Sequence, residues 1–461
     1  MITANARRPS ARWVFTCTLT NVSALHIGGG PGDTVDALVR RDRAEPERPL
    51  IPGTTLAGIL RSNLADRLAG FGQPEPPEVA LLFGASRASE DPQFSVLSIA
   101  DAIGFPVVIE VRDGVAIDAE SGTAADHAKF DYEVVPAGST FVCAFELLIR
   151  RPKGTQPDEE QQLAALAVET LCALDDGISL GGRVTRGLGR MKASEWRAKR
   201  FDLTSADGWN EWLRRDPSAE PAGPVFASVI EAVAATAFEP ATVETPKWQR
   251  LVVDVELEAV DETFIRSAGT GAYSPDQRML VSAGKPTHTG TSLAGPLRAR
   301  ARRIAHLANK SELVTKLFGP EPNTTLSASP LRVSEHHIVD AGFVRVDRVR
   351  IERLTHGTVP GALFDEEIIE GGTLKVHIEL RNPHPETTGL LIACLKDLCT
   401  GELPTGGTAG VGRGRWVGNC ALTTVEGMSH HFSGRPDASE TSVATVAWLD
   451  SQLAALFEGA S

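Results

Sequence analysis

One glycine-rich pattern occurs twice in the chain, and this repetition restricts the possible folds more than any other feature. The spacing Gly-Gly-x4-Gly-x-Gly-Arg begins at Gly181 and again at Gly406, a displacement of 406 − 181 = 225 residues. Two other motifs recur in the same order, at residues 53–61 and 290–298 and at residues 82–84 and 317–319. Several motifs repeated in one order indicate tandem duplication. The sequence therefore predicts two copies of one domain.

The composition fits two folded domains without a membrane anchor. A chain of 461 residues divides into units of roughly 190 to 230 residues, each long enough for its own core. No apolar run reaches the roughly 20 residues that span a bilayer. Residues 1–12 carry three arginines and lack the apolar stretch of a secretory signal. We expect a cytoplasmic protein with no membrane contact.

The six cysteines are expected to be buried free thiols. They stand at positions 17, 143, 172, 394, 399 and 420, without any C-x-x-C pair, and several lie in apolar strand or helix patterns. This distribution favours free thiols over disulfides or a zinc site. We therefore expect no structural metal.

The formal net charge of −13 excludes a protein coated in basic surface. A local basic groove remains compatible with it, because nucleic-acid affinity depends on where the cations lie. Arginines cluster at residues 40–48, 183–190 and 298–303. The alternative for each cluster is a solvated face whose charge is offset by nearby acids.

Each copy shows the same order of predicted elements. A strand with period-two alternation opens each copy, at residues 15–22 and 251–258. Next comes a helix, for which Thr54 and Thr55, or Thr291 and Ser292, are candidate caps. Strands follow, and then helices at 160–173 and 389–399 precede the glycine-rich loops, each of which leads into a final strand.

This order predicts an α+β protein made of two tandem ferredoxin-like (RRM-like) domains with insertions. The first domain is expected at residues 13–200 and the second at 249–420. Between them, residues 201–248 are rich in Ala, Pro and acids and read as a linker with short helices. Residues 421–461 form a C-terminal tail with a helix at 442–457.

The glycine-rich loops are candidate phosphate-binding elements. Glycine lets the backbone approach a phosphate and leaves N–H donors unobstructed, while Arg183, Arg186 and Arg190 supply charge-assisted contacts. The alternative is a tight turn that merely requires positive φ. Similarly, the helix starts at residues 54–55 and 291–292 can face an anion or act as ordinary caps.

Several histidines have simpler explanations than catalysis. His26 precedes the glycine run 28–30 and is expected to face a neighbouring side chain. The adjacent pairs 336–337 and 430–431 point to opposite faces of a strand, which makes each pair a poor metal site. We expect both pairs to be surface residues.

Together these motifs resemble the RAMP superfamily, and specifically the repeated backbone subunits of type III CRISPR effector complexes that grip guide RNA. The resemblance covers residues 13–192 and 249–418, and a fusion of two such subunits is similar to the type III-D branch. The segments that carry it are the two glycine-rich loops and residues 25–30, 36–42, 50–61, 82–84, 117–123 and 349–357.

The resemblance implies that both copies contact guide RNA. In the first copy the expected RNA-binding residues are Gly28, Gly29, Gly30, Arg40, Arg41, Thr54, Thr55, Arg61, Gly181, Gly182, Arg183, Arg186, Gly187, Gly189 and Arg190. In the second copy they are Thr291, Ser292, Arg298, Arg353, Gly406, Gly407, Gly412, Arg413, Gly414 and Arg415.

The resemblance also implies a nuclease site. In this family a loop aspartate is required for metal-dependent cleavage of RNA paired to the guide, and Asp36 falls on that position, where it would hold Mg or Mn. Asp33 can assist or substitute. Ala37-Leu38 departs from the family pattern, in which a small residue and proline are common. Asp276 occupies the corresponding loop of the second copy, in a poorer match.

The leading hypothesis is a guide-RNA-binding backbone subunit that cleaves complementary target RNA in antiviral defence. Its partners would be the guide RNA, the target RNA and other type III effector subunits. One alternative is a non-catalytic scaffold of the same complex. Another is a guide-precursor processing endoribonuclease, although the first helix of each copy lacks histidine and only His288 and His306 flank the second.

Overall fold

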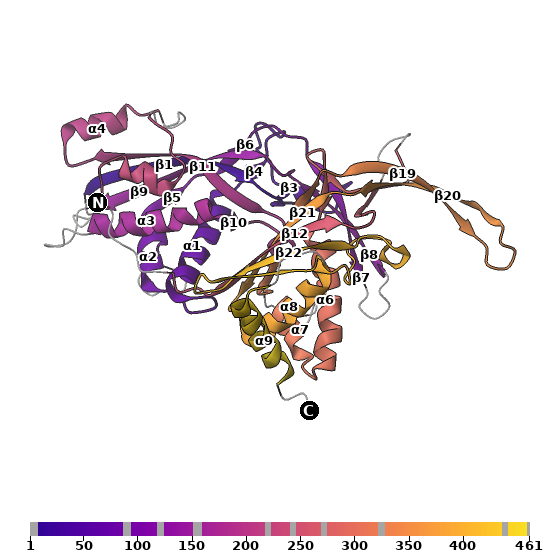
Figure 1. Ribbon diagram of the computed structural model, residues 1–461. Coiled ribbons are helices and arrows are strands. Elements are labelled where there is room, and N and C mark those ends of the chain that lie inside the picture. Colours follow the sequence, from indigo (N-terminus) through magenta and orange to yellow (C-terminus); the bar gives the residue numbers. More distant parts are fainter. Residues whose placement is uncertain are drawn as a thin grey trace.

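A computed structural model describes residues 8–85, 94–117, 124–150, 159–216, 223–239, 246–268, 274–320, 328–435 and 441–458. Part of one expected motif, residues 118–123, lies outside these ranges. The described residues form two α+β domains of the same topology (Figure 1). The expected pair of tandem ferredoxin-like domains is thus confirmed.

The first domain is an antiparallel sheet with helices on one face. Its strand order is β10-β11-β1-β9-β6-β4, with β5 also paired to β9. The strands are β1 (Pro9–Asn21), β4 (Leu50–Ile51), β5 (Leu97–Ile99), β6 (Ala102–Gly104), β9 (Thr140–Arg150), β10 (Ile178–Ser179) and β11 (Arg190–Asp202). The helices are α1 (Gly53–Ala69), α2 (Pro77–Phe83) and α3 (Glu159–Asp176).

The second domain repeats this arrangement. Its order is β15-β16-β18-β21-β12-β22-β23, with β17 paired to β21. The strands are β12 (Arg250–Ala259), β15 (Val281–Ser282), β16 (Lys285–His288), β17 (Leu331–Val333), β18 (His336–Val339), β21 (Thr373–Arg381), β22 (Trp416–Thr423) and β23 (Ser429–Ser433). The helices are α6 (Gly290–Leu307), α7 (Glu312–Phe318) and α8 (Pro385–Cys399). In each repeat the opening strand lies between the same two neighbours, β9 and β11 or β21 and β22.

Insertions and connecting segments complete the chain. Each repeat carries a β-hairpin, and the second one projects from the body (Figure 1). The hairpins are β7 (Glu110–Ile117) with β8 (Ala124–Val134), and β19 (Gly342–Ile351) with β20 (Thr358–Glu370). Shorter elements are β2 (Gly28–Gly30), β3 (Leu38–Val39), β13 (Arg266–Ala268), β14 (Gln277–Met279), η1 (Val184–Arg186) and η2 (Ala409–Val411). The connection contains α4 (Ala206–Leu213) and α5 (Val229–Ala234), and the tail helix α9 (Val443–Phe457) packs on α8.

Alternation along the strands explains the two cores. In β1, Trp13, Phe15, Cys17 and Leu19 point to the helix-covered face and are almost fully buried, as period two requires. The second repeat buries the corresponding face of β12 against α6 and α8. Each repeat thus has its own core, and the opposite face of each sheet is left for other contacts.

The start of α1 differs from expectation. Thr54 and Thr55 lie inside the first turn, and the helix has no side-chain cap. Instead, the N–H of Gly53 donates to the Asp101 carboxylate at 2.7 Å. In the second repeat the cap is Thr289, whose hydroxyl accepts from the N–H of Ser292 at 3.2 Å. The expected caps at residues 54–55 and 291–292 are therefore wrong.

The cysteine prediction is confirmed for the thiol state. All six cysteines are free, and five are buried, with Cys172 partly exposed. Within the described residues, no helix is both long and apolar enough to cross a membrane.

The two repeats meet through a buried ion pair. The guanidinium of Arg112, in β7, forms two hydrogen bonds with the carboxylate of Glu335, beside β17, and both side chains are almost fully buried. Glu335 also accepts from the N–H of Ala24 at 3.3 Å. Next to this pair, the backbone of Gly187 lies against residues 333–335 of the second repeat. The first glycine-rich loop is thus part of the contact between repeats.

Replacement of Gly187 and Gly412 by alanine should separate backbone strain from packing between repeats. Both glycines have φ near +95° (96° and 94°), so alanine adds a similar strain, about 1–3 kcal/mol, at each. A Cβ on Gly187 would also lie 2.6 Å from the Glu335 nitrogen, whereas the space around Gly412 is open. We expect Gly187→Ala to lower the free energy of unfolding by about 1–3 kcal/mol more than Gly412→Ala, measured by urea titration. Equal losses would show that Gly187 does not pack against the second repeat.

Candidate nucleic-acid interface

Both glycine-rich loops adopt the same backbone conformation. In the first, Arg183 and Gly187 flank η1 with φ angles of 60° and 96°. In the second, Thr408 and Gly412 flank η2 with φ angles of 58° and 94°. Positive φ favours glycine, so the repeated spacing encodes a repeated turn.

The glycine N–H groups of these loops are largely used within the protein. Gly182 donates to the carbonyl of His26 at 2.8 Å, and Gly189 donates to that of Ala24 at 2.7 Å. The equivalent bonds of the second loop are Gly407 to Phe264 at 2.6 Å and Gly414 to Glu262 at 2.8 Å. The expectation of unobstructed donors is wrong for these four glycines, whose N–H groups fix the turn.

Arg183 is stacked on aromatic rings of the first hairpin. Its guanidinium carbon lies 4.5 Å from the Phe130 ring centre and 4.3 Å from that of Tyr132. Burial lowers the pKa of Arg183 from its usual value. His26 meets the edge of Tyr132, and its Nδ1 lies 2.8 Å from the carbonyl oxygen of Glu133. The expectation that His26 faces a neighbouring side chain is confirmed.

The first glycine-rich loop lies beside the start of α6. A Cβ placed on Gly290 would be 2.5 Å from the Arg186 carbonyl oxygen, so the two segments touch. Arg186 and Thr291 are exposed there, and Ser292 is partly exposed. The structure thus brings together predicted RNA-binding residues from both repeats. A helix N-terminus with a neighbouring arginine is a favourable place for an anion.

The loop aspartates are held by the same pair of bonds in both repeats. The N–H of Asp36 donates to Asp131 Oδ1 at 2.8 Å, and the N–H of Asp131 donates back to Asp36 Oδ2 at 3.0 Å. In the second repeat, Asp276 and Asp365 exchange the corresponding bonds at 2.8 and 3.2 Å. Asp36 and Asp276 therefore occupy equivalent positions, and both are exposed. Asp33 is exposed in the same loop as Asp36.

The two aspartate pairs differ in their electrostatic surroundings. The guanidinium of Arg345, in β19, binds the Asp365 carboxylate. The N–H of Asp276, and then Arg345, lower the pKa of Asp365. Within the described residues, no cation forms an ion pair with Asp36 or Asp131. In the part of the chain that the structure describes, a fixed cation thus stands at the second aspartate pair and not at the first.

The first pair fits a divalent cation of the hard, oxygen-binding kind. Mg²⁺ is commonly held by one or two carboxylates together with phosphate oxygens and water. Asp36 and Asp131 each give one carboxylate oxygen to an N–H, which leaves the other oxygen of each available. Within the described residues, no group of three or more His, Cys, Asp or Glu side chains could hold a metal without such outside ligands.

The arginines that were predicted to bind RNA differ in their exposure and in their ion pairs. Arg40, Arg186 and Arg353 are exposed. Arg61 and Arg415 form two-point ion pairs with Glu75 and Asp261. Arg413 is only 3% exposed and binds Glu262 and Glu366, so its guanidinium contacts protein instead of solvent. The remaining pairs are Arg41 with Glu133 and Arg298 with the Gly319 carbonyl.

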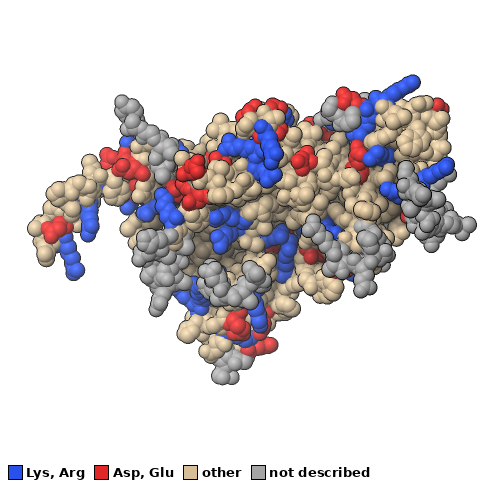
Figure 2. All heavy atoms as spheres, turned by 180° about the vertical axis from the view of Figure 1, so that it is seen from behind, with Lys and Arg blue, Asp and Glu red and all other residues tan. Residues whose placement is uncertain are grey.

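Basic and acidic side chains are interspersed on the face seen in Figure 2. Several Lys and Arg side chains line the hollowed middle of that face. A chain with an overall negative charge thus still presents local concentrations of cations, as the composition allowed.

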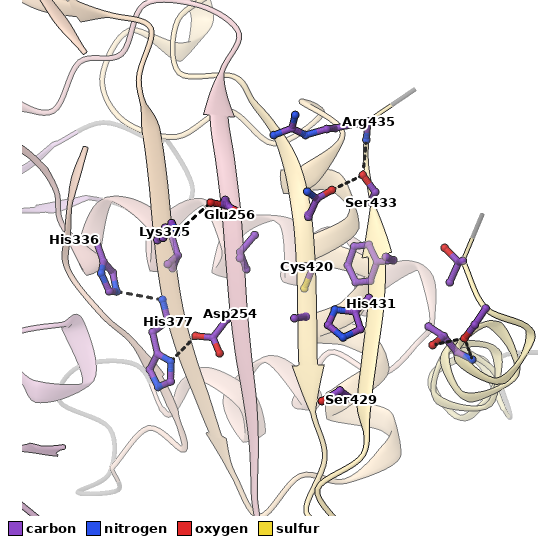
Figure 3. Close-up of a pocket in the computed structure, with 18 residues that line it drawn as sticks. Asp254, Glu256, His336, Lys375, His377, Cys420, Ser429, His431, Ser433 and Arg435 are labelled. Atoms are coloured by element: carbon purple, nitrogen blue, oxygen red, sulfur yellow. Dashed lines mark hydrogen bonds and ion pairs between the residues drawn. The ribbon is translucent and has the colours of Figure 1, made fainter. Parts of the chain in front are cut away.

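A groove of about 900 Å³ lies over the second sheet (Figure 3). In it, His377 Nδ1 lies 2.8 Å from Asp254 Oδ1, and His336 Nε2 accepts from the N–H of His377 at 3.2 Å. The hydrogen bond to His377 lowers the pKa of Asp254, while burial lowers the pKa of His336 to about 4. His336 is therefore neutral at pH 7. Lys375 and Arg435, which also line the groove, pair with Glu256 and Glu258.

Two histidine positions correct the sequence-based expectation. His430 is buried, with its ring stacked on Trp448 of α9 at 4.1 Å, and His336 is partly buried in the groove, so neither is a plain surface residue. His288 is also buried, and its Nε2 lies 2.8 Å from the Thr405 hydroxyl. His430 and His288 thus contact other elements of the second repeat: His430 of β23 packs on α9, and His288 of β16 contacts the second glycine-rich loop region at Thr405.

Asp131 and Asp365 are site residues that the sequence did not identify. Each lies in a hairpin strand about 90 residues after its partner, at 131 − 36 = 95 and 365 − 276 = 89 residues. Their shared signal is an aromatic residue followed by Asp, Phe130-Asp131 and Phe364-Asp365, opposite Asp113 and Asp347 on the paired strands. That signal is too short to be recognised without the fold.

Comparison with known proteins agrees with this duplicated geometry. The family model of the RAMP superfamily matches residues 18–192 and 256–417, which together make up most of the chain. No curated protein matches the chain significantly. The two matched regions coincide with the two structural repeats and contain both glycine-rich loops. The chain therefore belongs to the RAMP superfamily and is a CRISPR-associated RNA-binding subunit.

Proposed function

We propose that the protein is a guide-RNA-binding backbone subunit of a type III CRISPR interference complex, acting in antiviral defence in the cytoplasm. Its first repeat would cleave complementary target RNA through Asp36. The observation that carries this proposal is the reciprocally bonded aspartate pair, which both repeats build from the same loop and the same hairpin.

The guide RNA would run across the junction of the repeats. Arg186 and the N-terminus of α6 offer a cation, the positive end of a helix dipole and hydroxyls within one small surface. The exposed glycines 28–30 let a backbone approach closely, and the exposed Arg40 lies near them in the chain. These contacts address phosphates and so suit a subunit that must accept any guide sequence.

Cleavage would take place at the loop of Asp36. A divalent cation held there supplies Lewis-acid stabilisation of charge on the scissile phosphate. The chain itself holds the carboxylate of Asp36 at the surface, fixed by the bonds to Asp131, and leaves Asp36 exposed and Asp131 partly exposed. The attacking group would be the 2′-hydroxyl of a nucleotide splayed out of the duplex.

The second repeat is better suited to a scaffold. Arg345 already neutralises Asp365 beside Asp276, so a cation at this pair would face a fixed positive charge. In the first repeat, Arg41 instead binds Glu133, two residues beyond Asp131. We therefore assign the cut to the first repeat.

The contact between repeats also supports a neighbouring RAMP domain in the complex. It is heterologous, because the glycine-rich loop of one repeat docks on a different surface of the other, and such contacts can continue at free ends. In the second repeat the equivalent loop is open: Gly412 has no atoms near its Cβ position, and Val411 is 65% exposed. The projecting β19–β20 hairpin (Figure 1) adjoins this loop, because Glu366 of β20 binds Arg413.

The alternatives are less well supported. A non-catalytic scaffold would use the same RNA path but would not need the outward carboxylates of the first repeat. A guide-precursor processing enzyme would need a histidine at the surface near the start of the first helix of a repeat. His288 is buried against Thr405. His306 is exposed, but it lies in the last turn of α6, at the opposite end of the helix from Thr291.

Substitution of the aspartates should separate the two repeats. In a reconstituted complex with Mg²⁺ or Mn²⁺, we expect Asp36→Asn to slow cleavage of the target RNA at one position by about 100-fold or more, because a positioned carboxylate is lost. Asp276→Asn is the matched control and should leave every cut intact. EDTA should abolish the Asp36-dependent cut. Unchanged cutting by Asp36→Asn, with guide binding retained, would favour the scaffold alternative.

Substitution of Arg186 should weaken RNA binding in a salt-dependent way. We expect Arg186→Ala to reduce guide-RNA affinity and to lower the salt slope of binding by about one, the effect of losing one phosphate contact. Arg61→Ala is the control, because both hydrogen bonds of the Arg61 guanidinium go to Glu75, which already offsets its charge. Filter binding at several salt concentrations measures both. An equal effect of the two variants would contradict an RNA path across the junction.

A further inference from the structure

The open faces of the two sheets share one acidic position. Glu146 in β9 lies opposite Val14 of β1, and Glu379 in β21 lies opposite Val252 of β12. Each glutamate forms an ion pair with the arginine two residues earlier on the neighbouring strand. These pairs are Arg12 with Glu146 at 3.1 Å and Arg250 with Glu379 at 3.9 Å. The two glutamates are thus structurally equivalent.

On the second repeat, this position is covered by the first repeat and the end of the connection. Arg381 binds Glu379 at 3.3 Å and reaches Asp66 of α1 at 3.9 Å. The rings of Phe71 and Trp248 stack 5.7 Å apart. Arg381 lies 4.4 Å from the Phe71 ring, and Arg250 lies 4.6 Å from that of Trp248. The docked first repeat therefore contributes the Phe71 ring over the acidic position, and the connection contributes Trp248 beside it.

On the first repeat, the chain covers the same position with its own connecting segment. Arg215, just after α4, binds Glu146 at 2.8 Å. Arg12 lies 4.2 Å from the Trp212 ring, and Arg215 lies 5.2 Å from it. The Trp212 ring also meets the edge of Phe201, in the small cluster that buries Val14 completely.

We propose that residues 205–215 are a built-in cap, which occupies on the first repeat the surface where a RAMP domain docks on the second. Each occupant places an aromatic ring on an arginine that binds the equivalent glutamate: Trp212 lies on Arg12, which binds Glu146, and Phe71 lies on Arg381, which binds Glu379. The cap lies at the end of the molecule opposite the projecting β19–β20 hairpin (Figure 1). This inference rests on the proposed function, in which heterologous contacts between RAMP domains continue at free ends. It adds that a neighbour can dock at the β19–β20 end of the chain and not at the α4 end.

The cap has a direct consequence for assembly. One surface holds one occupant, so another RAMP domain can reach Glu146 only after α4 leaves. The free end, with Val411 and Gly412, stays open for a neighbour, while the α4 end is closed. A chain without the cap would expose the docking surface of its first repeat to the open loop of a second copy of the same chain.

Removal of the cap should make the full-length chain associate with itself. We expect Trp212→Ala with Arg215→Ala to give a mass that rises with concentration from one chain to two or more, whereas the wild type stays at one chain in light scattering. The control is Trp209→Ala with Arg214→Ala on the same segment, because Trp209 is exposed at the surface of α4. It should leave the mass unchanged. Addition of Val411→Glu to the cap variant should restore the mass of one chain.

Two results would contradict the proposal that residues 205–215 act as a cap. One is a cap variant that folds, as judged by circular dichroism, and keeps the mass of one chain at every concentration. The other is a wild-type chain that already associates and is dispersed by Val411→Glu. If the double variant does not fold, Arg215→Glu alone repels the segment from Glu146 but retains Trp212, and it must then show the same rise in mass. None of these readouts uses RNA, so they are independent of the binding and cleavage that test the proposed function.

Discussion

The buried pair of Arg112 and Glu335 fixes how the two repeats meet, and the proposed RNA path depends on that arrangement. Both side chains lose nearly all their water, and the pair is compensated by two direct hydrogen bonds and by the N–H of Ala24. Loss of one partner would leave an uncompensated buried charge, which typically costs about 3–5 kcal/mol. A buried pair of this kind favours one register between the repeats over others.

The two repeats share the backbone conformation of their glycine-rich loops and aspartate pairs, but the charged side chains around these features differ. The glycine-rich loops keep their φ angles and their hydrogen bonds, and the aspartate pairs keep the same donors and acceptors. In contrast, no arginine among the described residues pairs with Asp131 as Arg345 pairs with Asp365, and Arg183 corresponds to Thr408. A shared fold therefore carries two electrostatic environments, and the proposal that only the first repeat cleaves RNA rests on this difference.

The fold could be predicted from the sequence because its signals are local. Period-two strands, helical apolar faces and glycine spacing appear within short windows, and they gave the order of elements twice. The start of α1 could not be predicted, because Gly53 is capped by Asp101, a residue 48 positions away. Burial of Arg413 also depends on Glu262 and Glu366, which are distant in the chain. Asp131 was missed for the same reason, since the partner of Asp36 comes from a separate hairpin.

The central claim is that both repeats form one continuous RNA path across their junction. Its most direct test is photo-crosslinking from a reactive amino acid placed at position 186 or at position 291, in separate complexes that contain the guide RNA. The account predicts that both positions crosslink to the guide, at neighbouring nucleotides. Crosslinks to distant parts of the guide, or to the protein alone, would contradict it.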